Sequence, residues 1–183
     1  MKKILTNLAL ALLIAAGATG CMSDIVKNTF VSYAEPTSGD LAHVRLIGSR
    51  DVKVFPASDC PSSDVPGFGY PAGPQLGGQR KRDLGMPKTG QEPGHYVEIA
   101  ARGDEPITAT FNLGRTEGRF VYTCRVAHTF VPKAGHNYEM DADWIGSTCI
   151  GAVYEILPSA TGFERKRVAS REAVCPNAAP ERT

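Results

Sequence analysis

The chain has 183 residues, with 20 lysines and arginines against 19 aspartates and glutamates and a formal net charge of +1. This balance gives no electrostatic bias toward nucleic acid or an anionic surface as a partner. The length fits one domain that is large enough to bury a core of its own.

The first predicted element is an export signal over residues 1–20. Lys2 and Lys3 precede an apolar run over residues 4–16, and small residues follow over residues 17–20. The run is too short for a membrane-spanning helix, so the pattern predicts a cleaved signal peptide. Removal of the signal takes away both lysines and changes the net charge to −1.

A cysteine stands directly after the expected cleavage point. The stretch Ala18-Thr19-Gly20-Cys21 resembles the lipobox of bacterial lipoproteins. This resemblance implies that Cys21 carries a diacylglyceryl group and a further acyl chain (palmitate), which together hold a protein stably on a bilayer. It also implies a tether over residues 21–27 and, because Met22 rather than Asp follows, the periplasmic face of the outer membrane. The alternative is a secreted protein in which Cys21 is only the first mature cysteine.

Residues 28–183 are expected to form a single domain of β-strands. Apolar and β-branched residues alternate with polar ones at a period of two, and turn signals separate the runs. This pattern predicts an all-β fold, an antiparallel β-sandwich. The expected strands are residues 26–33, 42–47, 52–55, 96–101, 107–112, 119–130, 137–142, 149–157 and 163–170.

The loop over residues 60–95 is rich in glycine and proline. An insertion of this length without regular structure is usually functional or disordered. Phe68 and Tyr70 offer apolar anchors, and Arg80, Lys81 and Arg82 add positive charge, so we interpret this segment as a candidate interaction loop. The alternative is that the loop only covers a sheet edge while the three basic residues stay in solvent.

The run over residues 119–130 shows the clearest alternation. Its apolar side is expected to face the core, and His128 is interpreted as a core histidine rather than a ligand because its neighbours at two-residue spacing are apolar. The residues on this side are Phe120, Tyr122, Cys124, Val126, His128 and Phe130.

The segment over residues 130–138 has the pattern F-x-P-x-x-G-x-x-Y. A strand is expected to end at Pro132, Gly135 to adopt a positive φ, and Tyr138 to open the next strand, which predicts a hairpin. The pattern resembles a hairpin of small bacterial envelope lipoproteins of unassigned function and of transthyretin-like domains. Over residues 119–149 this resemblance implies an immunoglobulin- or transthyretin-like sandwich and carries no catalytic residue across.

Four cysteines remain besides Cys21, an even number in a chain expected in an oxidising compartment. We therefore predict two disulfides. Among three pairings we favour Cys124–Cys149, because these residues lie in runs joined by the predicted hairpin, and this leaves Cys60–Cys175. A zinc site is the alternative, but the paired C-x-x-C spacing of structural zinc sites is missing.

The sequence contains no catalytic motif that we can identify, and no metal or cofactor is predicted. The four histidines form no H-x-x-x-H pair, and no serine lies in a G-x-S-x-G elbow. Glu139, Asp141 and Asp143 would share one face of a strand and could bind calcium, with a solvated strand face as the alternative. Trp144 is expected to cap the core at a strand end.

These observations predict a membrane-anchored lipoprotein that acts as a structural or interaction module, is not an enzyme, and has an envelope protein as its partner. The alternative is a small-ligand or glycan-binding lipoprotein, with Trp144, Phe68 and Tyr70 as an aromatic platform and residues 80–82 as the anion contact. A binding protein needs these aromatics in one concave pocket, whereas an interaction module needs them on an exposed patch.

Overall fold

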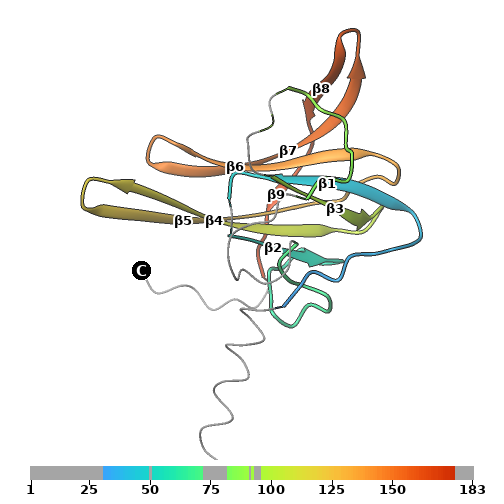
Figure 1. The fold of residues 1–183 in the computed structure, drawn as a ribbon. Helices are drawn as coiled ribbons and strands as arrows, with labels where there is room; N and C mark the ends of the chain where they lie inside the picture. The colour runs from blue at the N-terminus through green and yellow to red at the C-terminus, as the bar shows by residue number, and fades with distance from the viewer. Residues whose placement is uncertain (1–30, 50, 72–81, 91, 93–95, 176–183) are drawn as a thin grey trace, which may run out of the picture.

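A computed structural model describes residues 31–49, 51–71, 82–90, 92 and 96–175. In this part of the chain nine strands form two sheets that lie face to face, and no helix is present (Figure 1). The predicted all-β sandwich is therefore confirmed. The described residues also include no helix with the length and hydropathy needed to cross a membrane.

The first sheet has the strand order β3-β1-β6-β7-β8. β1 pairs antiparallel with β3 but parallel with β6, so this sheet is mixed rather than purely antiparallel. Its strands are β1 (Leu41–Ile47), β3 (Tyr96–Arg102), β6 (Asn137–Ile145), β7 (Thr148–Ser159) and β8 (Gly162–Arg167).

The second sheet has the order β2-β4-β5-β9, and every pair in it is antiparallel. The core lies between the two sheets, where one side chain in two points inward along each strand. The strands are β2 (Asp51–Pro56), β4 (Ile107–Glu117), β5 (Phe120–Phe130) and β9 (Arg171–Glu172).

Strand positions follow the sequence alternation closely, and strand ends follow it less well. β4 and β6 run past their predicted ends, and β9, which has only two residues, was not predicted. Of the strand predicted over residues 26–33, only residues 31–33 are described. There Ser32 forms an isolated bridge with Tyr70.

The predicted hairpin over residues 130–138 is wrong, because β5 and β6 belong to different sheets. The segment is an arch that carries the chain from the second sheet to the first. Gly135 has the predicted positive φ, 77°, and its N–H donates to the carbonyl oxygen of Leu41 at 2.7 Å. Across the arch, the rings of Phe130 and Tyr138 pack edge to face with centroids 5.0 Å apart.

Both predicted disulfides are present. Cys60 and Cys175 have Cα atoms 4.7 Å apart, and Cys124 and Cys149 have Cα atoms 6.5 Å apart. The second bridge joins β5 to β7 and therefore crosses between the sheets, rather than linking neighbours through a hairpin. The predicted pairing was right, although the geometry behind it differs.

Candidate functional site

Two hairpins project together from one end of the sandwich (Figure 1). We call residues 114–124 of the β4–β5 hairpin and residues 143–150 of the β6–β7 hairpin the hairpin end. Each hairpin closes with a two-residue turn whose first residue is a glycine, Gly118 with φ 60° and Gly146 with φ 62°. A positive φ at this position matches the twist of the flanking strands, which explains why tight hairpins form here.

The hairpin end exposes large apolar side chains. Phe120 is 68% exposed, Val121 70% and Ile145 60%, and Tyr122 and Ile150 are also exposed. Rigid apolar surface of this kind typically marks an interaction site, because leaving it in water is unfavourable.

The exposure of Phe120 and Tyr122 corrects their predicted place in the core. On this side of β5, Val126 and Phe130 are buried and His128 is half-buried, but β4 and β5 continue past the part of the sandwich that covers them. Apolar and polar residues do alternate along β5, but the strand extends beyond the core.

The two hairpins are fixed to each other at two levels. The disulfide Cys124–Cys149 joins them at their base, and farther out Arg115 Nη1 donates to the carbonyl oxygen of Gly146 at 3.1 Å. The Arg115 guanidinium also lies 4.8 Å from the centre of the Trp144 ring. These contacts make the hairpin end one preorganised body rather than two independent loops. Trp144 packs against the core at a strand end, as predicted.

A second feature is a buried charge cluster on the outer face of the first sheet. Arg45 of β1 is fully buried and lies opposite Glu98 of β3 and Glu139 of β6, its direct partners in the register. Arg45 Nη2 lies 2.8 Å from Glu98 Oε1, and Arg45 Nη1 lies 2.6 Å from Glu139 Oε1. Burial by itself lowers the pKa of Arg45, but the hydrogen bonds that it donates to both glutamates raise this pKa above its usual value.

The second half of the long loop covers this cluster. We call residues 82–90 the covering segment. Arg45 Nη2 donates to the carbonyl oxygens of Met86 and Pro87 at 3.3 and 2.9 Å, and the N–H groups of Leu84 and Met86 donate to Glu98. Glu92 adds a third carboxylate 3.2 Å from Arg45. The loop is therefore anchored through the polar groups of a sheet face.

The acidic run of β6 is part of the same network. Glu139 and Asp141 share a face, as predicted, and Arg165 of β8 binds them at 2.7 and 3.1 Å. With Arg45 and Arg165 beside them, these carboxylates are neutralised by cations of the chain itself. The described residues hold no cluster of three or more His, Cys, Asp or Glu side chains arranged to bind a metal.

The residues of the candidate interaction loop have different environments. Phe68 is buried and stacks on Phe55 with ring centroids 5.6 Å apart, and Lys53 Nζ lies 5.1 Å from the centre of the Tyr70 ring. Arg82 pairs with Glu35, and its backbone bridges to the β3 edge. Arg80 and Lys81 lie outside the described residues, so their contact with a partner stays a prediction, as does the lipidation of Cys21.

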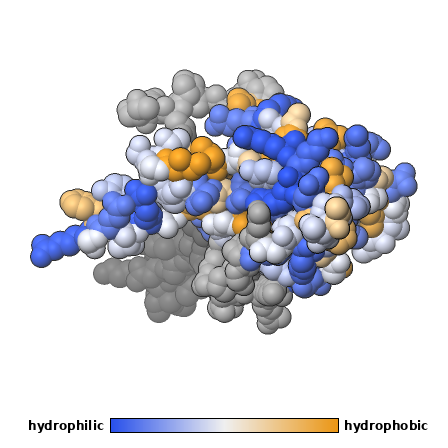
Figure 2. Space-filling view, turned by 90° about the horizontal axis from the view of Figure 1, so that it is seen from above, coloured by the Kyte–Doolittle hydropathy of each residue, from blue (hydrophilic) through white to orange (hydrophobic). Residues whose placement is uncertain are grey.

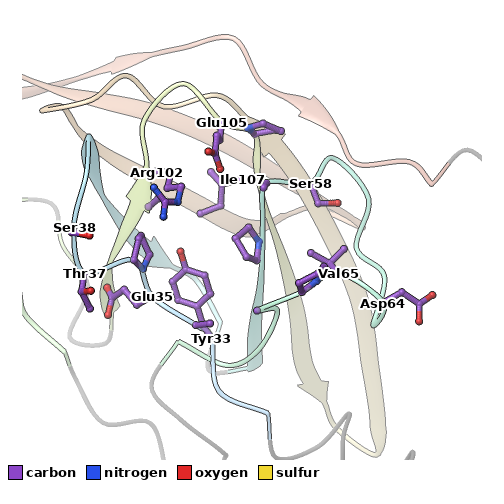
Figure 3. A pocket seen from close by; sticks show the side chains of 18 residues that line it. Tyr33, Glu35, Thr37, Ser38, Ser58, Asp64, Val65, Arg102, Glu105 and Ile107 are labelled. Atoms are coloured by element: carbon purple, nitrogen blue, oxygen red, sulfur yellow. The ribbon is translucent and has the colours of Figure 1, made fainter.

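A groove of about 820 Å³ lies at the opposite end of the molecule, between residues 33–38, 56–67 and 101–107 (Figure 3). Its floor is apolar, with Ile107 almost fully buried, and Tyr33 donates to the carbonyl oxygen of Ala100 at 3.0 Å. Burial raises the pKa of Tyr33 well above its ordinary value. Arg102 reaches into the groove and forms no ion pair with a described residue. The predicted aromatic platform does not form here, because the lining contains neither Trp144 nor the two loop aromatics.

A smaller side groove of about 300 Å³ lies between β5 and β7, near the hairpin end. It is lined by Arg125, His128, Gly151, Arg167 and Glu172, among others. The His128 ring lies directly on Gly151, where any Cβ would overlap it, and burial lowers the pKa of His128. The histidine thus packs between the sheets, but its Nδ1 atom is buried and has no hydrogen-bond partner among the described residues.

Comparison with protein-family models, with curated proteins and with solved structures finds no match to this chain. The functional argument therefore depends on the geometry of these surfaces.

Proposed function

We propose that this chain is a lipid-anchored interaction module of a bacterial envelope and that the hairpin end contacts its partner. The observation that carries the proposal is the exposed apolar surface on two hairpins tied by a disulfide and by Arg115. The resemblance to a lipobox at Cys21 supports the anchor, and two disulfides suit an oxidising compartment.

The rest of the described surface supports this choice. Seen from above, the face over the first sheet is mostly hydrophilic, with separate hydrophobic patches (Figure 2). The hairpin end instead carries large exposed apolar residues on strands of both sheets. An interface core is depleted in charge and enriched in aromatic residues, which fits Phe120 and Tyr122.

Photo-crosslinking in cells tests the proposal. A photoreactive residue at Val121 is expected to give a discrete protein adduct in the membrane fraction, because this side chain is 70% exposed at the hairpin end. The matched control is Val131, a 56% exposed valine at the other end of β5. Equal adducts from both sites, or none from Val121, would contradict the interaction.

A Cys21→Ser variant that remains in the membrane fraction would contradict the anchor.

The groove at the opposite end favours ligand binding as a second candidate function. Its apolar floor is suited to a small, mainly apolar molecule with a polar group that Arg102 can contact, although the lining also holds the carboxylates of Glu35, Asp64 and Glu105. We expect ligands from a fragment screen followed by NMR to shift the signals of Arg102 and Ile107, and Arg102→Ala to abolish the shifts. Lys133→Ala is the control. Shifts scattered over the surface, or retained in Arg102→Ala, would exclude a site here.

A further inference from the structure

The outer edge of β5 has no pairing partner among the described residues over its first half. On one side, β5 pairs with β4 along its whole length, in a register without a bulge. On the other side, β9 reaches only His128 and Thr129, and one further hydrogen bond joins Ala173 N–H to the Ala127 carbonyl. No described residue pairs with the outer edge from Phe120 to Val126.

The register identifies the backbone groups that face outward. In a strand, N–H and C=O groups point to the same side at every second residue. Because Ala127 bonds outward to Ala173, the groups of Arg125, Thr123 and Val121 must also point outward. These three residues present a row of donors and acceptors that no described residue occupies, which is a template for an added strand.

The surroundings of this edge differ from those of the β8 edge in the first sheet. β8 has charged residues at four of its six positions, a common protection against strand pairing. β5 instead presents exposed Phe120, Val121 and Tyr122 along its free half. A strand added there would cover apolar side chains on both faces of the sheet.

Positive charge lies at both ends of the free edge. Arg119 stands at the turn, and Arg125 lines the side groove together with Arg167 from β8. None of these three arginines forms an ion pair with a described residue, and Glu172 is the only acidic residue in the lining of the side groove. The edge therefore favours a segment with acidic residues, and it disfavours a second copy of β5, which would bring arginines together.

We propose that the partner adds an extended acidic segment as a strand to the β5 edge, with its backbone bonded to Val121, Thr123 and Arg125. This inference rests on the proposed function and assigns the chemistry of the partner. Main-chain hydrogen bonds would supply affinity, and the alternation of apolar and acidic side chains would supply specificity.

The test uses two synthetic peptides of about eight residues, long enough for a typical strand. One alternates valine with glutamate and threonine, and the other has lysine in place of glutamate. Amide exchange is followed by NMR on the signal-free chain carrying Cys21→Ser, with both disulfides formed. We expect the acidic peptide to slow exchange at Val121, Thr123 and Arg125 by about tenfold, since these amides become hydrogen-bonded. The lysine peptide should not.

Two variants at one position separate backbone pairing from side-chain contact. Thr123→Pro removes the outward N–H but leaves the ladder with β4 intact, so it should fold and lose binding. Thr123→Val keeps the N–H and a β-branched side chain, so it should bind like the wild type. Arg125→Gln should weaken the acidic peptide several-fold, and Lys133→Gln, which removes an exposed cation of the arch, is its control.

Three outcomes would overturn the inference: equal binding of both peptides, protection at β8 instead of β5, or self-association of the free chain that protects the β5 amides. The crosslinking experiment stays informative in each case. A partner adduct at Val121 without edge protection would keep the proposed function and remove strand addition. Absence of the adduct would remove the proposed function itself.

Discussion

Replacement of Arg45 by methionine is expected to lower the free energy of unfolding by about 3 to 5 kcal/mol, the usual cost of removing one partner from a buried ion pair. The side chain of Arg45 is fully buried, and those of Glu98 and Glu139 are 0% and 1% exposed. Without the guanidinium these two buried carboxylates would lose the cation that lies between them, leaving only Arg165 at Glu139 and Lys88 3.6 Å from Glu98. The carbonyls of the covering segment would also lose their donor.

Urea denaturation measures this effect. The control is Arg82→Met, which removes a partly exposed ion pair with Glu35 and should cost about 1 kcal/mol or less. Adding Glu98→Gln and Glu139→Gln to Arg45→Met should restore part of the loss, because neutral amides are cheaper to bury than charges. An Arg45→Met variant with an unchanged midpoint would show that the cluster contributes nothing to stability.

Loss of the Cys60–Cys175 disulfide is expected to destabilise the chain more than loss of Cys124–Cys149. The bridges close sequence separations of 115 and 25 residues. Loop-closure entropy in the unfolded chain then gives about 5 kcal/mol for the longer loop and about 3.5 kcal/mol for the shorter one.

The double variants Cys60→Ala/Cys175→Ala and Cys124→Ala/Cys149→Ala, compared by thermal and urea denaturation, test this order. Each pair is removed completely, so that no free thiol remains from it. The reverse order would show that native contacts at the hairpin end outweigh the entropy of the unfolded chain. In that case the Cys124–Cys149 bridge would be chiefly a device for holding the two hairpins together.

The fold class and most strands could be predicted because the period of two is a local property of the chain. Strand ends could not, since they depend on how far the partner strands extend. Phe120 shows this: its place in the alternation indicates the core side of β5, yet no local pattern reveals where the covering sheet stops.

Features that depend on strand order were not predictable from the sequence. Arg45, Glu98 and Glu139 are far apart in the chain and form a cluster only because the order is β3-β1-β6. The arch over residues 130–138 has the turn residues of a hairpin. It differs from a hairpin only in that Tyr138 joins the other sheet. The open half of the β5 edge likewise could not be predicted, because it depends on where β9 pairs with β5.

The parallel pairing of β1 with β6 also determines when the molecule can fold. Arg45 and its β6 partner Glu139 are separated by 94 positions in sequence, and β1 and β3 by about half of that. Closing such distant contacts slows folding, because chain entropy is lost before the contacts form. The first sheet cannot be completed until residues 137–145 are available, so in a growing chain that ends at the arch Arg45 would be without its Glu139 partner and β1 without one of its two neighbours.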